Sequence, residues 1–453
     1  MNLPNYFLAD LPPGTALDAA TVREACRTLK RNRTQFLARR RTSEIIELLA
    51  RVASGWLRPD DPFRALALEA GPEATGFGRA TLARGLDAFF EQLTPERLRA
   101  LLVQELGDDR ALDECVAETG PGETHRARLA TGPELLVHIT AGNIPSPALL
   151  SMVLGLLTRS AQFVKCASGA ALLPRLFAHS IYRADAKIGA CLEVAEWPGG
   201  HEALEAALFE QADCVTATGR DETLAAIRAR LPVRTRFVGY GHRVSFAFVT
   251  RVALSAERAP QILADAAADV VAWNQLGCLS PHVIYVQRGG DWTARQFASE
   301  LAAELERREA GEPRGALPVA SAAEIASRRA AYEVRAAHSP STALWQSAGS
   351  TAWTVVYEED PTFVLSCLNR FIYVKPARDL SEVLEQAASV RGQVSTVGLA
   401  ATDLERPALA LELARWGVTR VCPLGRMQTP PLTWRHDGRP PLGELVTWTD
   451  VER

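Results

Sequence analysis

The fold of this chain is decided by one stretch, LLVHITAGNIPSPALLSMVLGLLTRSAQFVKCA, residues 135–167. Residues 135–140 and 161–167 are short apolar runs typical of buried strands, and residues 145–160 between them predict a helix. A strand, a helix and a second strand in this order form a parallel crossover, because antiparallel neighbours need only a short turn. The stretch therefore predicts a parallel α/β sheet.

The same alternation continues toward the C-terminus, so we expect a doubly wound, mostly parallel sheet and then a second α/β unit over roughly 250–420. Upstream, residues 20–116 have a helical pattern, and glycine and proline at 120–122 mark a break before the first strands. The further expected segments are helix 171–185, strand 191–197, helix 201–211, strand 213–219, strand 243–249, helix 261–275 and strand 282–287.

Composition narrows the class of protein. With 453 residues and 47% hydrophobic content, the chain is expected to fold into two or three domains. Its 50 basic and 53 acidic residues give a formal charge of −3, which argues against a nucleic acid or an anionic membrane as partner. The longest apolar run, 147–157, is too short to cross a bilayer, and residues 1–14 lack the features of a signal peptide. We expect a cytoplasmic protein with a small ligand.

Eight cysteines are present, with no C-x-x-C spacing and no clustering with histidines that would indicate a metal site. Seven of them lie in apolar or mixed contexts and are interpreted as reduced core residues. Cys278 lies in VVAWNQLGCLSPHVIYV, residues 270–286, between an expected helix and an expected strand. From this context alone it is either a nucleophile or a buried thiol.

Three segments place polar or small residues after expected strands: ITAGNIPSP, KCASG and TATGRDET. Carboxyl ends of parallel strands are where an open α/β sheet binds its ligand. None of the segments has G-x-G-x-x-G spacing, and GYGHR at 239–243 lacks the third glycine. The phosphate-loop pattern is also missing. So is G-x-S-x-G, and its absence removes the usual sequence support for an α/β-hydrolase.

Taken together and in order, these motifs resemble the aldehyde dehydrogenase superfamily, and more closely its LuxC-like acyl-CoA reductase branch. The resemblance covers about 135–450 and implies an α/β fold with a Rossmann-type cofactor domain, a second α/β catalytic domain and a small β oligomerisation arm. Its carriers are HITAGNIPSPALLSMVLGLL, QFVKCAS, DCVTATGRDET, FVGYGHRVSFAFV, WNQLGCLSPHVIYV, LNRFIYV and WRHDGRPPLGELVTW.

The resemblance also implies a domain organisation. A helical lead-in at 1–120 would pack on a dinucleotide-binding domain at 121–248, and a catalytic domain with the nucleophilic cysteine would follow at 249–420. The C-terminal return, 421–453, would form the oligomerisation arm with residues 124–138. Relatives pair through such an arm, so we expect a homo-oligomer.

Two residues carry the implied catalysis. Cys278 matches the cysteine whose thiolate attacks a carbonyl, and Asn143 in GNIP matches the asparagine whose amide, with the cysteine N–H, forms the oxyanion hole. From its own context Asn143 is equally a turn-former beside proline. His282, four residues past Cys278, is expected to be structural, while His242 in the glycine turn is either structural or close to the ligand.

The implied cofactor is NADPH, with NADH possible. Lys165 matches the lysine that contacts the adenine ribose or its 2′-phosphate, although a solvated strand-end lysine fits the sequence equally well. Ser168 stands where NAD-preferring relatives often carry a glutamate that repels a 2′-phosphate, so a neutral serine leaves room for NADPH. Thr218 and Gly219 match a turn that approaches the pyrophosphate at a helix start. The remaining cofactor candidates are Thr140, Ala141, Arg220 and Gly241.

Two departures from the superfamily pattern point toward reduction. Aldehyde oxidisers carry Glu-Leu-Gly-Gly, whose glutamate activates water, where this chain has Val238-Gly239-Tyr240-Gly241. Without that base an acyl-enzyme should persist until a hydride releases it as an aldehyde. The second departure is SCLNRFIYV, 366–374, in place of Glu-x-Phe-Gly-Pro. It leaves the ribose contacts unassigned. Asn369 and Arg370 either face the site or have a structural role as a salt-bridged or capping residue.

We therefore expect an acyl-CoA or acyl-protein thioester reductase that makes an aldehyde. A fatty, branched or aromatic acyl group fits the same motifs, and an acyl-activating synthetase or transferase is a possible partner. Two alternatives stay open: a hydrolytic aldehyde dehydrogenase, and a catalytically silent scaffold for an acyl-activating partner.

Overall fold

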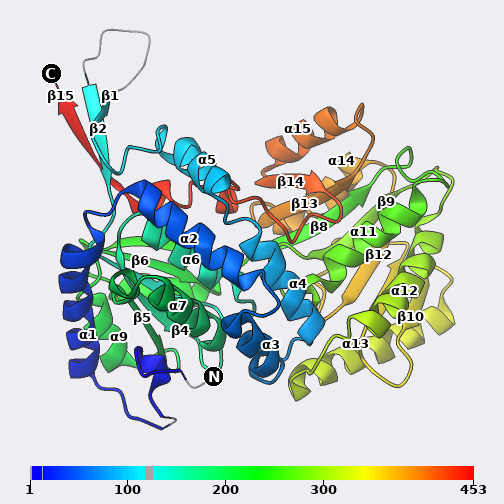
Figure 1. Ribbon diagram of the computed structural model, residues 1–453. Coiled ribbons are helices and arrows are strands. Elements are labelled where there is room, and N and C mark those ends of the chain that lie inside the picture. Colours follow the sequence, from blue (N-terminus) through cyan, green and yellow to red (C-terminus); the bar gives the residue numbers. More distant parts are fainter. Residues whose placement is uncertain (1–2, 13, 118–125, 453) are drawn as a thin grey trace. The chain divides into compact units, whose positions relative to one another are not determined.

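The computed structural model describes residues 3–12, 14–117 and 126–452 (Figure 1). The predicted break at 120–122 and the first two residues of the predicted arm, 124 and 125, lie outside this part of the chain. The chain forms two compact units. Unit 1 comprises Met1–Thr75, Leu86–Gly241 and Pro431–Arg453, and unit 2 comprises Gly76–Gly85 and His242–Pro430.

Unit 1 contains a five-stranded sheet in which all neighbours are parallel, in the order β5-β4-β3-β6-β7. The chain proceeds from β3 outward to β5, then returns to the other side of β3 and continues to β7. The carboxyl ends of β3 and β6 therefore flank the switch point, where doubly wound sheets hold a ligand. The strands are β3 (Leu135–Ile139), β4 (Ala161–Cys166), β5 (Leu192–Glu196), β6 (Cys214–Thr218) and β7 (Arg236–Tyr240).

Helices cover both faces of this sheet (Figure 1). Alternate strand residues such as Leu135 and Val137 join a core with Val22 of α1 and Leu208 of α9. On the opposite face α6 packs on β4, and α7 on β5. The helices of the first half of the chain are α1 (Ala19–Asn32), α2 (Thr42–Trp56), α3 (Pro62–Thr75), α4 (Arg79–Phe90), α5 (Pro95–Leu106), α6 (Ser146–Leu157), α7 (Leu172–Ala184), α8 (Ala186–Gly189), α9 (Glu202–Phe209) and α10 (Asp221–Arg230).

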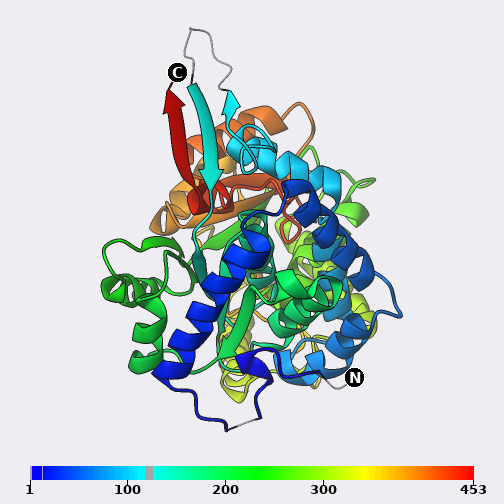
Figure 2. The ribbon, with the colours of Figure 1, turned by 60° about the vertical axis from the view of Figure 1, so that its left-hand side comes forward.

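A small antiparallel sheet extends away from the five-stranded sheet of unit 1 (Figures 1 and 2). It pairs β1 (Val116–Ala117) with β2 (Arg126–Thr131), and β2 with β15 (Thr447–Glu452). The predicted arm reached from 124 to 138, but the strand at Leu135–Ile139 belongs to the parallel sheet instead. Gly132 and Pro133 separate the two strands, so each joins a different sheet.

Unit 2 contains a seven-stranded sheet in the order β10-β11-β12-β9-β8-β13-β14, in which only β10 runs antiparallel to its neighbour. The strands at 243–249 and 282–287 expected from the sequence are β8 and β9 at its centre. The strands are β8 (Val244–Val249), β9 (Pro281–Gln287), β10 (Thr342–Gln346), β11 (Thr354–Glu358), β12 (Phe371–Ala377), β13 (Val394–Ala400) and β14 (Arg420–Pro423).

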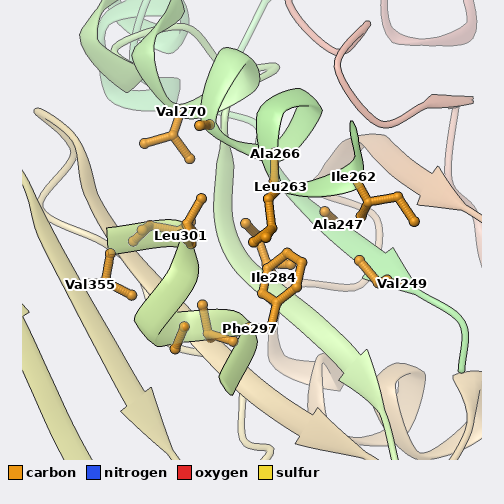
Figure 3. Packing of buried hydrophobic residues seen from close by; sticks show 14 of the residues in the cluster. Ala247, Val249, Ile262, Leu263, Ala266, Val270, Ile284, Phe297, Leu301 and Val355 are labelled. Carbon is orange, nitrogen blue, oxygen red and sulfur yellow. The ribbon is translucent and has the colours of Figure 1, made fainter. Parts of the chain in front are cut away.

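Apolar residues of this sheet pack against helices on both faces. Figure 3 shows Phe297 and Leu301, one turn apart on α12, beside Ile284 and Val355 of the sheet. The two layers of helices confirm the predicted doubly wound α/β fold. No helix of the described ranges is both long and apolar enough to span a membrane. The helices of unit 2 are α11 (Ala259–Val271), α12 (Ala294–Gly311), α13 (Val319–His338), α14 (Leu380–Gln386) and α15 (Arg406–Trp416).

Candidate functional site

A pocket lies at the switch point of unit 1, between the carboxyl ends of β3 and β6. It encloses about 280 Å³ of empty space, part of which is open to solvent. Four of the predicted site residues, Thr140, Ala141, Asn143 and Thr218, line it together. The full lining is His138, Ile139, Thr140, Ala141, Asn143, Ile144, Pro147, Ala148, Ser151, Thr216 and Thr218.

His138 of β3 lines this pocket, although no sequence motif singles it out. Its side chain is buried; Nδ1 lies 2.6 Å from Thr216 Oγ1, and Nε2 lies 3.0 Å from Gln162 Oε1. Burial lowers the pKa of His138 to about 4, although the hydrogen bond with Gln162 opposes this shift. The imidazole is therefore neutral near pH 7, and the pocket wall carries no positive charge at this position.

Acidification is expected to destabilise the protein through His138. The ordinary pKa of a histidine is 6.5, and in the folded protein the pKa of His138 is about 4. Between pH 4 and pH 6.5 His138 therefore binds a proton in the unfolded chain but not in the folded one. The free energy of unfolding keeps its full value with respect to His138 above pH 6.5. It decreases by up to about 3 kcal/mol as the pH falls toward 4. Denaturant titrations from pH 7 to pH 4 should show a smaller loss for His138→Gln than for the wild type. Equal losses in both proteins would contradict this assignment.

Lys165 ends β4 at the same edge of the sheet and is only 4% exposed, so it is not the solvated lysine that the sequence left open. Its Nζ makes no hydrogen bond or ion pair with any residue of the described ranges and lies 5.8 Å from the ring centroid of Trp197. Burial lowers the pKa of this amine, and the carboxylates of Glu205 and Glu196 oppose the shift. A buried ammonium without an ionic partner is typical of a ligand-binding position.

The turn after β4 contains Ser168 and Gly169. Ser168 is exposed, and Gly169 adopts a left-handed φ of 78°, which glycine tolerates best. The N–H of Gly169 donates to Glu196 Oε1 at 2.7 Å, so the turn is held by the last residue of β5.

The turn after β6 leads directly into α10. Thr218 and Gly219 are half-buried, and Arg220 is exposed at the N-cap without a side-chain capping hydrogen bond. The first turn of α10 contains Asp221 and Glu222, whose negative charges compete with any anion at this helix start. A Cβ at Gly241 would lie 2.3 Å from Asp221 Oδ1, so a side chain at this position would require Asp221 to shift.

The segment that replaces Glu-Leu-Gly-Gly is fixed within unit 1. Val238 to Tyr240 belong to β7, and the carbonyl of Gly239 accepts a hydrogen bond of 2.6 Å from Arg439 Nη2. The ring of Tyr240 stacks on His436 at a centroid distance of 4.1 Å. No residue from 236 to 243 is acidic. The C-terminal return thus holds a strand end that supplies no carboxylate of its own.

Cys278 belongs to unit 2, whereas the other predicted site residues belong to unit 1. It is half-buried in the turn between η3 (Ala272–Gln275) and β9, at the amino end of that strand. Its carbonyl accepts a hydrogen bond from Ser245 Oγ at 2.8 Å, and within the turn Ser280 N–H donates to Gly277 O at 2.9 Å. The expectation that site residues follow the carboxyl ends of parallel strands thus holds for the pocket of unit 1. It does not hold for Cys278, which precedes a strand.

The other cysteines differ from Cys278. Cys367 is half-buried with a pKa raised to about 11 by burial, and Cys115 is exposed, so the interpretation of all seven as core residues was wrong for Cys115. Burial raises the pKa of the remaining five thiols to about 12, which keeps them protonated and unreactive. These are Cys26, Cys166, Cys191, Cys214 and Cys422.

Two three-residue segments with left-handed backbone precede β9 and β12. Positive φ is costly for residues other than glycine, and such strain concentrates at functional sites. The segments brace each other: Arg370 Nε donates to Asn274 Oδ1 at 3.2 Å, and Gln275 Nε2 donates to the carbonyls of Pro281 at 2.8 Å and Phe371 at 3.0 Å. Their φ angles are 50°, 51° and 64° for Trp273, Asn274 and Gln275, and 62°, 58° and 65° for Leu368, Asn369 and Arg370.

Arg370 has a structural role. It is 1% exposed, and its Nη1 donates to Glu309 Oε2 at 2.7 Å and to the carbonyl of Glu312 at 2.9 Å. Through Asn274 it holds the segment that leads into the turn of Cys278. Of the two roles that the sequence left open for Arg370, the salt-bridged one is observed.

His282 is also structural, as expected. It is buried, and its Nδ1 accepts a hydrogen bond of 3.0 Å from the N–H of Ser366. Burial lowers the pKa of His282 to about 4, and the nearby His242 and Arg328 lower it further. A neutral imidazole at this position cannot act as a cation that stabilises a thiolate.

Solved structures establish the class of fold. A putative aldehyde dehydrogenase from Anabaena variabilis matches 97% of this chain and 93% of its own length, with a TM-score of 0.70 and 16% identity. An NAD-dependent benzaldehyde dehydrogenase from Corynebacterium glutamicum matches 97% of this chain and 90% of its own, with a TM-score of 0.70 and 14% identity. The protein has the aldehyde dehydrogenase fold.

Within that fold the sequence identifies the family. The family model described as acyl-CoA reductase (LuxC) matches residues 37–448, and the chain belongs to this family. A long-chain acyl-protein thioester reductase from Aliivibrio fischeri is 25% identical over 70% of this chain and 64% of its own length. Long-chain acyl-protein thioester reductase 2 from Photobacterium leiognathi is 26% identical over 78% of this chain and 70% of its own length. The chain thus spans somewhat less than two thirds of the first relative.

Proposed function

We propose that the protein reduces an acyl thioester to an aldehyde through an acyl-enzyme on Cys278, with NADPH as the reductant. The single observation that carries this proposal is the absence of an acidic residue at the end of β7. Residues 238–241, which match the position of the water-activating glutamate of aldehyde oxidisers, contain no acid and are fixed by Arg439. Family membership and the names of the relatives support the same reaction.

The first half of the reaction uses residues of the chain alone. The Cys278 thiolate attacks the thioester carbonyl, and the side-chain amide of Asn143 with the Cys278 N–H donates to the oxyanion. Collapse of this tetrahedral intermediate breaks the original C–S bond and releases the carrier thiol. Cys278 then holds the acyl group as a new thioester, and residues 238–241 offer no carboxylate that would activate water against it.

The second half needs a hydride, which NADPH supplies when bound. The switch-point pocket, the turns after β4 and β6, and the buried ammonium of Lys165 fit a dinucleotide in unit 1. Lys165 would attract a 2′-phosphate, and the neutral Ser168 would not repel it. Asn143 again stabilises the oxyanion formed at the acyl carbon, and collapse releases the aldehyde and restores the Cys278 thiolate.

The same proposal gives the parts of the chain their roles. Unit 1 would hold the dinucleotide, with Thr140, Ala141, Thr218, Gly219, Arg220 and Gly241 as further contacts, and unit 2 would present the nucleophile. The sheet of β2 and β15 would pair copies of the chain. The names of the relatives support a long acyl chain on a protein thiol, and the family description supports CoA as the other carrier. An acyl-activating synthetase or transferase would be the partner that delivers the acyl group.

The test is a balanced assay. Purified protein receives a long-chain acyl-CoA and NADPH; trapped aldehyde and oxidised coenzyme should appear in equal amounts. A hydrolytic aldehyde dehydrogenase would instead convert aldehyde to acid faster than it reduces the thioester. A silent scaffold would show neither reaction and no quenching of tryptophan fluorescence by NADPH.

Replacement of Asn143 should separate catalysis from turn formation. Asn143→Asp keeps a side chain that forms turns but cannot donate to an oxyanion when ionised. We expect kcat to fall by about 10²–10³ with a nearly unchanged KM, since a donor to the transition state is lost. Steady-state kinetics and thermal melting of both proteins would measure this. Wild-type kcat in Asn143→Asp would show that Asn143 serves only the turn.

A further inference from the structure

Glu196 is the last residue of β5 and lies at the edge of the sheet where the dinucleotide is proposed to bind. In the parallel pairing of β4 and β5, Ala195 lies opposite Lys165, and Glu196 opposite Cys166. The side chain of Glu196 is half-buried, and its Oε1 accepts the Gly169 N–H at 2.7 Å. A carboxylate is therefore built into the turn that contains Ser168.

Lys165 and Glu196 give this edge two opposite charges that do not form an ion pair. Glu196 acts electrostatically on the Lys165 ammonium, and neither makes a salt bridge with a residue of the described part of the chain. The other carboxylate acting on Lys165, Glu205, is already paired with Arg230. Glu196 Oε1 is used by the turn, whereas its Oε2 has no hydrogen bond within the described ranges.

We propose that Glu196 sets the selectivity between NADPH and NADH. This inference rests on the proposed function, in which the adenosine ribose lies over the turn after β4. There the carboxylate would repel a 2′-phosphate and accept a hydrogen bond from a 2′-hydroxyl, whereas Lys165 attracts the phosphate. Glu196 thus supplies the acidic group that position 168 lacks, and it comes from the neighbouring strand. Because of Glu196, the preference for NADPH over NADH is smaller than the preference that Lys165 and Ser168 would give without it.

The test removes the charge and keeps the turn. Glu196→Gln retains an oxygen that accepts the Gly169 N–H. Calorimetry would measure binding of adenosine 2′,5′-bisphosphate and of 5′-AMP, fragments that differ at the 2′ position. We expect the ratio of their affinities to shift about fivefold toward the bisphosphate, as for one partly screened charge. Glu210→Gln, an exposed change at the far end of α9, is the control and should leave the ratio unchanged.

A second variant keeps the test valid if Glu196→Gln folds poorly. Ser168→Glu adds a carboxylate at an exposed position and should shift the ratio about fivefold toward 5′-AMP. Binding of both fragments by the wild type, with a ratio unchanged in Glu196→Gln, would overturn the role of Glu196 and leave the proposed function standing. If the wild type binds neither fragment nor NADPH, the dinucleotide site and this inference both fail.

Discussion

Cys278→Ala is expected to lower the rate of thioester reduction at least about 10⁴-fold, because the proposed acyl intermediate forms on the Cys278 thiolate. Without the thiolate a hydride would have to reduce the free thioester directly, and the acyl group would never be held in place. NADPH oxidation and aldehyde formation, measured with an acyl-CoA, would both fall to background. Binding of NADPH in unit 1 should be unaffected.

Two other cysteines provide matched controls. Cys367 is half-buried in the same unit, and Cys115 is exposed. Cys367→Ala and Cys115→Ala should each keep at least half of the activity, because neither thiol carries the acyl group. The assignment of Cys278 would be wrong if Cys278→Ala retained more than a tenth of the wild-type rate.

Arg370→Met is expected to destabilise the protein by about 3–5 kcal/mol, the usual effect of removing one partner from a buried charge network. The change leaves the carbonyl of Glu312 and the amide oxygen of Asn274 without their Arg370 donors, and Glu309 loses its guanidinium partner while it keeps the Arg314 N–H. Burial lowers the pKa of Arg370 to about 10, and Glu309 and Glu312 oppose that shift, so the charge is retained at neutral pH. Urea denaturation at pH 7 would measure the loss.

An exposed ion pair is the control for this experiment. Arg378 pairs with Asp379 at 3.0 Å; the arginine is exposed and the aspartate is half-buried. Arg378→Met should change the stability by less than about 1 kcal/mol, as expected for a surface pair. If Arg370→Met lost no more than Arg378→Met, the left-handed segments would not depend on this arginine.

The pattern of apolar residues predicted much of the fold, because the formation of a strand or helix depends largely on residues that are neighbours in the sequence. Residues 135–140 and 161–167 are mostly apolar, as expected for strands buried on both faces, and they form β3 and β4. The structure differs where the partner of a strand is distant. Residues 126–131 and 135–139 both have strand character, but only the pairing of β2 with β15 shows that they join different sheets.

The residues that support the site were less accessible to sequence reasoning. Motif order singled out Thr140, Asn143 and Thr218, which line one pocket. Glu196 and His138 are ordinary strand residues in sequence, and only the structure shows that they contact the turn after β4 and the strand β4. Motifs identify residues that are expected to contact a ligand. The residues that position them and change their electrostatic environment are found only from tertiary contacts.

The central claim is that the acyl group on Cys278 waits for hydride and resists water. The most direct test incubates the protein with a radiolabelled acyl-CoA in the absence of coenzyme, then adds NADPH and follows the label by rapid quenching. We expect label to remain on Cys278 for many turnover times and to leave as aldehyde once NADPH is added. Release as free acid at the turnover rate before NADPH is added would contradict the account.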